Sequence, residues 1–242
     1  MPTTPERSAI VGWGSVTPLG ANAQTTWQAA LGGRSGIQAL HDLWSTDLAT
    51  RIAGRVEDSA FASLEPILLR RADRCSQLAL LAARQAWAMA LERAPGLDPD
   101  RVAVVIGTGI GGLSTMHEQH MQLSEGGPSR VNPLTVPMLI PDAPAGQVAI
   151  DLGLHGGAHA PVSACASGAE AMMLAQMLLN DDRADLVLAG GTEAPVRTGL
   201  ALWGFPPCAR CRAATTRQSR PHVLTASTET ALCCQRARGF LQ

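Results

Sequence analysis

The 242-residue chain contains no lysine and no tyrosine, so all 19 of its basic residues are arginines. Because lysine codons are rich in A and T, their absence indicates a GC-rich coding sequence. The formal net charge is only -1, which argues against a nucleic-acid-binding protein. No apolar run approaches the roughly 20 residues that a membrane span needs, and the first residues lack the apolar segment of a secretory signal. We therefore expect a cytoplasmic protein that neither crosses a membrane nor binds nucleic acid.

The composition changes near Pro206. Residues 1–205 hold 13 arginines and 19 acidic residues, whereas residues 206–242 hold 6 arginines, Glu229 as their single acidic residue, and four of the six cysteines. This last stretch shows no sustained strand or helix periodicity. The chain is thus predicted to consist of one domain over residues 1–205 and an irregular tail over residues 206–242.

Within the domain, apolar segments of strand length alternate with longer helical segments. The predicted strands are residues 8–11, 102–106 and 186–189, and the predicted helices are residues 23–31, 71–91 and 169–180. Residues 102–106 are apolar throughout, as expected of a parallel strand buried on both faces. Residues 126–144 are rich in glycine and proline and are predicted to be irregular. This alternation indicates an α/β layered fold.

Cys165 is the candidate nucleophile. Residues 162–168 read VSACASG, so we expect a strand to deliver the cysteine to a tight turn with a helix directly behind it. The first amides of that helix have no partners and carry about half a positive charge, which favours the thiolate and can hold a developing oxyanion. An inert buried cysteine is the alternative, because a lone cysteine usually has that fate.

Residues 107–112 read GTGIGG after a predicted strand, which resembles a dinucleotide-binding loop. That interpretation requires an acidic residue about 20 positions further on, at the end of a second strand. Glu125 lies near this distance, but it is surrounded by SEGGP and does not end a strand. NAD binding is therefore not favoured.

Two further patterns could suggest a metal or thiol site. His117 and His120 share one helix face, but no third ligand is evident. Cys208 and Cys211 form a single C-x-x-C pair and residues 233–234 are adjacent cysteines, which is weak evidence for zinc or a dithiol. We predict no metal and no cofactor, and a thiol or zinc module in the tail remains the alternative.

Three more segments contribute to a resemblance to a known family. They read VGWGSVTPLG at residues 11–20, VPMLIP at residues 136–141 and ADLVLAGGTEA at residues 184–194. Together with the segments around Cys165 and the glycine loop, and in this order, they resemble the N-terminal half of the β-ketoacyl-acyl carrier protein synthases. These are the condensing enzymes of fatty acid and polyketide synthesis. The resemblance implies a thiolase-like α/β fold of which residues 1–205 form the first of two similar halves.

The resemblance also implies roles for two residues. Cys165 would accept an acyl group from a carrier-protein thioester, and its backbone amide would be one oxyanion donor. Ile110 would line or gate the acyl-chain channel, unless the glycines around it serve only close packing. Acyl-Cys165 would then condense with malonyl-carrier protein in a decarboxylating Claisen reaction that needs no metal or cofactor.

The family reaction also uses two histidines, one in a His-Gly-Thr motif and one in a Gly-His motif. None of the six histidines of this chain stands in either setting. The catalytic histidines are thus absent from this chain, as is the Gly-Phe-Gly loop that supplies the second oxyanion donor. We expect a truncated chain that could be acylated but could not complete the reaction alone.

The tail permits a further hypothesis. Read one base out of frame, the codons for residues 207–217 and 228–234 can encode segments that resemble the family sequences LRALSRRNDP and RDGFVL. We therefore hypothesise that the residues after Phe205 are translated out of frame; an authentic alternative C-terminus is the other possibility.

The expected partners are acyl carrier protein, bearing acyl and malonyl groups, and a second copy in a homodimer. A non-catalytic partner or pseudoenzyme that pairs with a full-length synthase is the alternative function. Related chain-length partners usually lack the cysteine, so Cys165 argues against this alternative.

Overall fold

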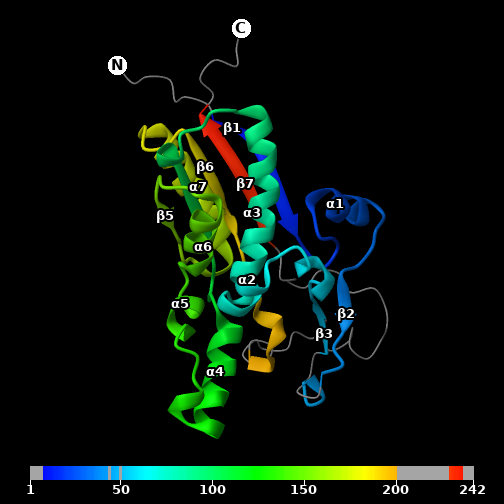
Figure 1. The fold of residues 1–242 in the computed structure, drawn as a ribbon. Coiled ribbons are helices and arrows are strands. Elements are labelled where there is room, and N and C mark those ends of the chain that lie inside the picture. Colours follow the sequence, from blue (N-terminus) through cyan, green and yellow to red (C-terminus); the bar gives the residue numbers. More distant parts are fainter. Residues whose placement is uncertain (1–7, 43–44, 49–50, 201–228, 237–242) are drawn as a thin grey trace.

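The computed structural model describes residues 8–42, 45–48 and 51–200, and the backbone of residues 229–236. Its main sheet has five strands in the order β1-β7-β6-β4-β5 (Figure 1). The pairs β4–β6 and β4–β5 are parallel, while β7 runs antiparallel to both of its neighbours. The strands are β1 (Ser8–Val16), β4 (Val102–Gly107), β5 (Ala158–His159), β6 (Leu186–Gly191) and β7 (Glu229–Arg236).

The described part of the chain also contains seven α-helices, a small hairpin and several short 3-10 helices. The hairpin pairs β2 (Ile37–Ala39) with β3 (Ile52–Gly54). The helices are α1 (Ala23–Leu31), α2 (Pro66–Arg71), α3 (Arg74–Arg93), α4 (Leu113–Gly126), α5 (Thr135–Leu139), α6 (Ala143–Leu152) and α7 (Ser167–Asn180). None of these helices is both long and apolar enough to cross a membrane.

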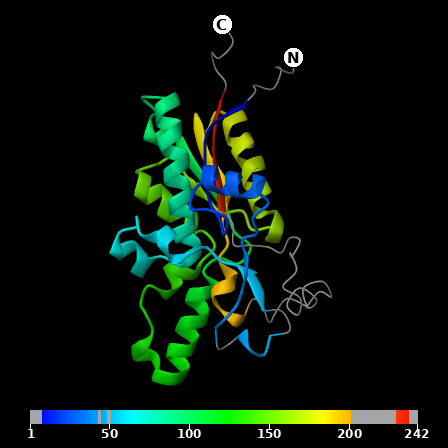
Figure 2. The same ribbon diagram turned by 90° about the vertical axis from the view of Figure 1, so that its right-hand side faces the viewer.

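The sheet separates two apolar cores. Along β4, Val102, Val104 and Ile106 face the core shared with α3 and α6, whereas Ala103 and Val105 face the core shared with α7. Figure 2 shows this arrangement edge-on, with α3 and α7 on opposite sides of the sheet. The predicted parallel strand with two buried faces is confirmed.

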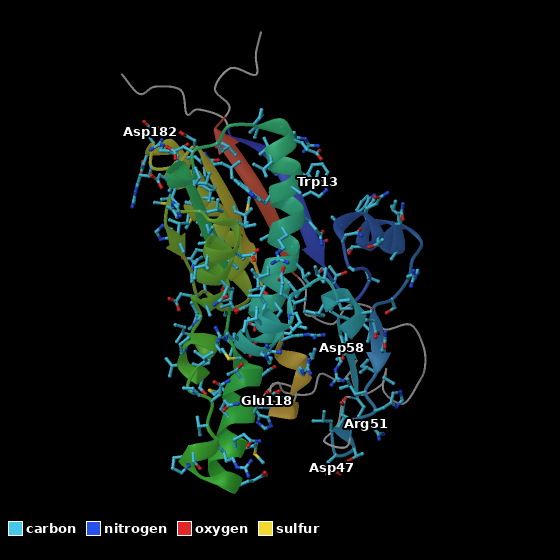
Figure 3. The ribbon with its side chains drawn as sticks, viewed as in Figure 1. Trp13, Asp47, Arg51, Asp58, Glu118 and Asp182 are labelled. Carbon is cyan, nitrogen blue, oxygen red and sulfur yellow. The ribbon has the colours of Figure 1, made fainter. Side chains whose placement is uncertain are left out.

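Small residues let α3 lie directly on β1. A Cβ atom at Gly12 or Gly14 would collide with the carbonyl oxygen of Ala86 or Ala82, so only glycine fits at these two positions. At the far end of α3, the Arg93 guanidinium lies 5.1 Å from the ring centroid of Trp13, which Figure 3 labels beside β1. These contacts fix the first strand against the helix that covers the sheet.

Several predicted elements are confirmed. Helix α1 has the predicted bounds and begins with a capping box, in which Asn22 accepts from the Thr25 amide at 2.8 Å. The strand predicted over residues 8–11 continues to Val16, and the one predicted over residues 186–189 continues to Gly191.

The helix predicted over residues 71–91 lies instead at Arg74–Arg93, because the Asp73 side chain caps its first turn. A separate short helix, α2, precedes it.

The prediction of an irregular segment over residues 126–144 was wrong in part, because residues 135–139 and 143–144 are helical. Helix α5 lies within this segment and contains Pro137, and α6 begins at its end with Pro144 in the first turn. Proline is tolerated there because the first N–H groups of a helix have no partner within the helix. The density of prolines therefore marked helix starts rather than irregular chain.

The tail also contains an element that its composition did not predict. Residues 229–236 form β7, which pairs along its length with both β1 and β6. Alternation of apolar and polar side chains is weak in this segment, so the backbone pairing could not be read from the sequence. The predicted irregular tail is thus corrected at residues 229–236, and residues 206–228 lie outside the described residues.

Candidate active site

Cys165 lies in a short turn, Ala164–Ala166, just before α7, and it is exposed. The strand predicted to lead up to it is wrong, because β5 ends at His159. Pro161 has no N–H to donate to a sheet, which is consistent with the early end of the strand. Ala164 turns the chain with a φ of 53°, a left-handed conformation that residues other than glycine rarely adopt. The thiol is therefore presented by a turn rather than by the end of a strand.

Ser167 holds this turn together. Its hydroxyl accepts from the Ser163 amide at 2.9 Å and donates to the Ala164 carbonyl at 2.7 Å. The same hydroxyl lies 3.2 Å from the Thr108 carbonyl, in the loop that follows β4. Ser167 is only 3% exposed, so these bonds are protected from water. One buried side chain thus joins the cysteine turn to the glycine loop.

The start of α7 is open toward the cysteine. The helix is 14 residues long and its N-cap is Ala166, with no side chain bonded to the first amides. The predicted arrangement of a cysteine directly before a helix without a side-chain cap is confirmed. Amides of this kind carry partial positive charge, which stabilises negative charge on a nearby sulfur or oxygen.

A close backbone approach places α7 behind the ends of β4 and β6. A Cβ atom at Gly191 would lie 2.9 Å from the Gly168 Cα, and one at Gly107 would collide with the Ser167 carbonyl. Glycine at these strand ends is therefore required by packing.

The loop of residues 109–112 has a protein acceptor for each of its four backbone N–H groups. Two donate to the Glu193 carboxylate at 3.1 and 3.0 Å, the third donates to Thr108 Oγ1 at 3.1 Å, and the fourth to the Leu139 carbonyl at 3.0 Å. A bound pyrophosphate would need these N–H groups and would be repelled by the carboxylate. Glu125 lies at the C-terminal end of α4 and not at a strand end. The geometry supports the prediction that this loop is no NAD site.

Glu193 was not identified from the sequence. Its Oε2 accepts from Thr108 Oγ1 at 3.2 Å in addition to the two loop amides, and its Oε1 accepts from the Ala194 amide at 3.3 Å. Burial raises the pKa of Glu193, because the loss of water outweighs these hydrogen bonds, which favour the ionised form. An acidic residue just after a predicted parallel strand was the available signal, since such strand ends meet at one edge of a sheet.

Ile110 lies in the middle of this loop and is 43% exposed. The neighbouring Gly109 lies close to two groups, because a Cβ atom there would be 3.3 Å from Glu193 Oε2 and 3.4 Å from the Ala164 carbonyl. The structure therefore brings the loop that carries Ile110 against the turn that carries Cys165.

A second carboxylate supports the loop from its other end. Asp73 is 3% exposed; its Oδ1 accepts from the Cys75 amide at 3.0 Å, and its Oδ2 accepts from the Thr115 amide at 2.8 Å. It thereby joins the starts of α3 and α4, and α4 follows directly on the glycine loop. Sequence reasoning missed this residue as well.

The described histidines are spread over several elements. His117 and His120 both lie on α4 as predicted, while His155 contacts Asp100 at 3.0 Å. Across the described residues, no three His, Cys, Asp or Glu side chains are placed to hold a metal ion. Cys208, Cys211 and the side chains of residues 233–234 lie outside the described residues.

A cavity of about 590 Å³ lies elsewhere, between the β2–β3 hairpin and the start of α3. Its lining does not include Cys165 or Ile110. Two of its arginines are paired with acids, Arg55 with Asp42 and Arg74 with Asp58, both at 2.8 Å. It is thus a separate feature with internally balanced charge.

Comparisons with known proteins identify the family to which this chain belongs. The family model described as the N-terminal domain of beta-ketoacyl synthase matches residues 6–221. The 3-oxoacyl-[acyl-carrier-protein] synthase 2 of Staphylococcus aureus (strain N315) is 39% identical over 201 residues, which cover 83% of this chain and 48% of that protein. The same-named protein of Synechocystis is 36% identical over 217 residues, or 89% of this chain and 51% of that protein.

Solved structures show the same fold. A beta-ketoacyl synthase from Burkholderia phymatum superposes with a TM-score of 0.78 at 23% identity, covering 96% of this chain and 59% of that one. A type II PKS ketosynthase, in complex with its acyl-carrier protein and bound to a hexaketide, also gives 0.78, at 24% identity and with 97% and 59% coverage. The thiolase-like α/β fold is confirmed.

The chain belongs to the β-ketoacyl synthase family and corresponds to its N-terminal domain. This is a family of acyltransferases that condense acyl groups. The chain spans about half the length of the curated relatives it matches. The family match continues past the boundary predicted at residue 205, to residue 221.

Proposed function

We propose that Cys165 is the acyl-accepting nucleophile of a 3-oxoacyl-[acyl-carrier-protein] synthase of fatty acid or polyketide synthesis. The observation that supports this most directly is an exposed thiol on a turn that buried Ser167 holds at the start of α7. The family membership and the names of the curated relatives support the same activity.

The first step is a thioester exchange. The Cys165 thiolate attacks the carbonyl carbon of an acyl thioester, and the carbonyl π electrons move to the oxygen. The backbone N–H of Cys165 stabilises this oxyanion. When the carbonyl re-forms, the bond to the donor sulfur breaks, and the leaving thiolate takes a proton from solvent. The acyl group then remains on Cys165.

Acyl carrier protein is the proposed donor of both the acyl and the malonyl group, because the curated relatives are named for it. In the second step malonyl-carrier protein loses carbon dioxide, and the resulting enolate carbon attacks the acyl-Cys165 carbonyl. The new carbon–carbon bond replaces the carbon–sulfur bond and frees the Cys165 thiolate. We propose that the 242-residue chain alone stops before this step, since none of its six histidines stands in the family motifs.

Intact-mass and peptide mass spectrometry test both the acylation of Cys165 and the arrest before condensation. The chain is incubated with an acyl-carrier protein, and then with malonyl-carrier protein. We expect one acyl group on the peptide that contains Cys165, none in Cys165→Ala, and no 3-oxoacyl product. An adduct on another cysteine would refute the nucleophile assignment, and turnover of malonyl-carrier protein would refute the predicted arrest.

We also propose that the codons after about Phe205 are read out of frame. The shift in charge and cysteine content after this residue supports the proposal. Sequencing the coding DNA from the Leu200 codon to beyond the stop tests it. A single inserted or deleted base, whose correction restores both histidine motifs, is the expected result; an unchanged reading frame would refute it.

A pairing role is the second candidate function. Two matched structures are described as a ketosynthase with its chain length factor, with TM-scores of 0.74 and 0.69. In this second role, the domain would form a homodimer or bind a full-length synthase. Sedimentation of the chain alone and with a full-length synthase distinguishes these assemblies. If activity of the complex is unchanged in Cys165→Ala, pairing rather than acylation is its contribution.

A further inference from the structure

Glu193 is placed to control the loop that carries Ile110. It follows β6, whose neighbour β4 leads into that loop, so its side chain spans the ends of two adjacent parallel strands. Three donors converge on its Oε2: the Thr108 hydroxyl and the amides of Gly109 and Ile110, at 3.0–3.2 Å. Successive amides that bind one oxygen fix the orientation of the peptide between them.

The same loop also contacts the cysteine turn. The Thr108 carbonyl lies 3.2 Å from the Ser167 hydroxyl, and a Cβ atom at Gly109 would lie 3.3 Å from Glu193 Oε2 and 3.4 Å from the Ala164 carbonyl. The loop thus contacts both the Glu193 carboxylate and the turn that presents Cys165.

We propose that Glu193 is a positioning residue, whose carboxylate fixes the Gly109–Ile110 peptide and thereby holds the Ile110 side chain beside the acyl group on Cys165. This proposal rests on the proposed function of Cys165 and on Ile110 as part of the acyl pocket. Glu193 does not touch the reacting atoms; it acts through the loop on the choice of acyl chain.

Glu193→Gln is the informative variant. Glutamine has the same shape, but it replaces one accepting oxygen with an NH₂ group, which faces either the loop donors or the Ala194 amide. Hydrogen bonds to a charged acceptor are also stronger than bonds to a neutral one. Glu118→Gln, on the exposed face of α4 (Figure 3), makes the same charge change away from the loop and serves as the matched control.

The first measurement is amide hydrogen exchange by NMR. We expect the amides of Gly109 and Ile110 to exchange at least about tenfold faster in Glu193→Gln, since charged hydrogen bonds of this kind are worth that factor or more. The amides of Val104 and Val105 in β4 should be unchanged, as should all of these amides in Glu118→Gln. Unchanged exchange at Gly109 and Ile110 would overturn the proposal. Circular dichroism verifies that each variant is folded.

The second measurement is the rate of Cys165 acylation by acetyl and dodecanoyl thioesters. We expect Glu193→Gln to lower the dodecanoyl rate about tenfold relative to the acetyl rate, because misplacement of a positioning group has effects of this size or larger. Alkylation of Cys165 by iodoacetamide should stay within about twofold of wild type. Glu193→Asp, which keeps the charge, should restore part of the dodecanoyl rate.

The outcomes separate this proposal from the proposed function. Faster exchange with an unchanged ratio of dodecanoyl to acetyl rates would overturn the role of Glu193 in acyl selection. If no thioester acylates the wild-type chain, the proposed function fails, and the acyl-selection role of Glu193 is overturned with it. The exchange rates then still decide whether Glu193 fixes the loop.

Discussion

Thr115 donates two hydrogen bonds to one carboxylate oxygen of Asp73, from its amide at 2.8 Å and from its hydroxyl at 2.7 Å. The other oxygen caps α3 through the Cys75 amide. Asp73→Ala leaves these buried donors unpaired, so we expect the free energy of unfolding to fall by about 2–4 kcal/mol. Chemical denaturation measures it. Thr115→Val, which removes only the hydroxyl, should cost about 1 kcal/mol; equal losses in the two variants would contradict the assigned role of Asp73.

The contact between Gly191 and Gly168 predicts a sharp contrast between two glycine substitutions. A Cβ atom at Gly191 would press on the Gly168 backbone, which is part of α7 and cannot easily move. Gly191→Ala should therefore cost about 1–3 kcal/mol of stability. At Gly146, inside α6, a Cβ atom meets nothing within 4 Å, so Gly146→Ala should gain about 0.5–1 kcal/mol. Thermal melts of both variants check this, and a stabilised Gly191→Ala would show that the approach is not tight.

Ser167→Ala should loosen the cysteine turn more than it destabilises the domain. The change removes the acceptor of the Ser163 amide and the donor to the Ala164 carbonyl, at a cost of about 1–2 kcal/mol. We expect the acylation rate of Cys165 to fall by more than this loss of stability explains. Cys75 is an internal reference because burial raises the pKa of its thiol, so it should stay unreactive in both proteins. Wild-type acylation rates in the variant would exclude Ser167 as the organiser of the turn.

The raised pKa of Glu193 predicts a pH-dependent difference between wild type and Glu193→Gln. The folded protein holds the Glu193 proton more tightly than the unfolded chain, whose carboxyl titrates near 4.5. The stabilisation from this group is therefore fully present below that pH and is lost as the pH rises through the folded-state pKa.

Glu193→Gln lacks this titration, so the stability of wild type relative to the variant should decline as the pH rises above about 4.5. Urea denaturation at four or five pH values measures the difference. If the stability difference is constant or grows with pH, burial does not set the direction of the pKa shift of Glu193.

Local patterns predicted the parts of the fold that depend on local sequence. The uninterrupted apolar run of β4 indicated a strand buried on both faces, and the helix predicted over residues 23–31 has the bounds of α1. The cysteine turn could be located because small residues directly precede the apolar helix. Each of these features depends on residues within a single element, and hydrophobic periodicity along the sequence is enough to predict it.

The parts that could not be predicted depend on contacts between distant residues. Glu193 contacts Gly109 and Ile110 across more than eighty positions, and Asp73 contacts Thr115 across 42. An acidic residue has the same local appearance whether it faces solvent or a loop from another strand. Strand β7 was missed for a similar reason, since its place in the sheet is set by the edges of β1 and β6 rather than by its own side chains.

The place of β7 also has a consequence for synthesis on the ribosome. Among the described strands, β1 joins the sheet only through β7, and Ser8 pairs with Arg236 (Figure 1). The first of these strands to be synthesised therefore cannot pair until the last one has been made. Until residues 229–236 emerge, a nascent chain exposes the open edges of both β1 and β6, which can pair with other chains. Pairings between such distant residues also form slowly. Productive folding of this sheet therefore waits until residues 229–236 have been synthesised, and chaperones can bind the exposed strand edges until then.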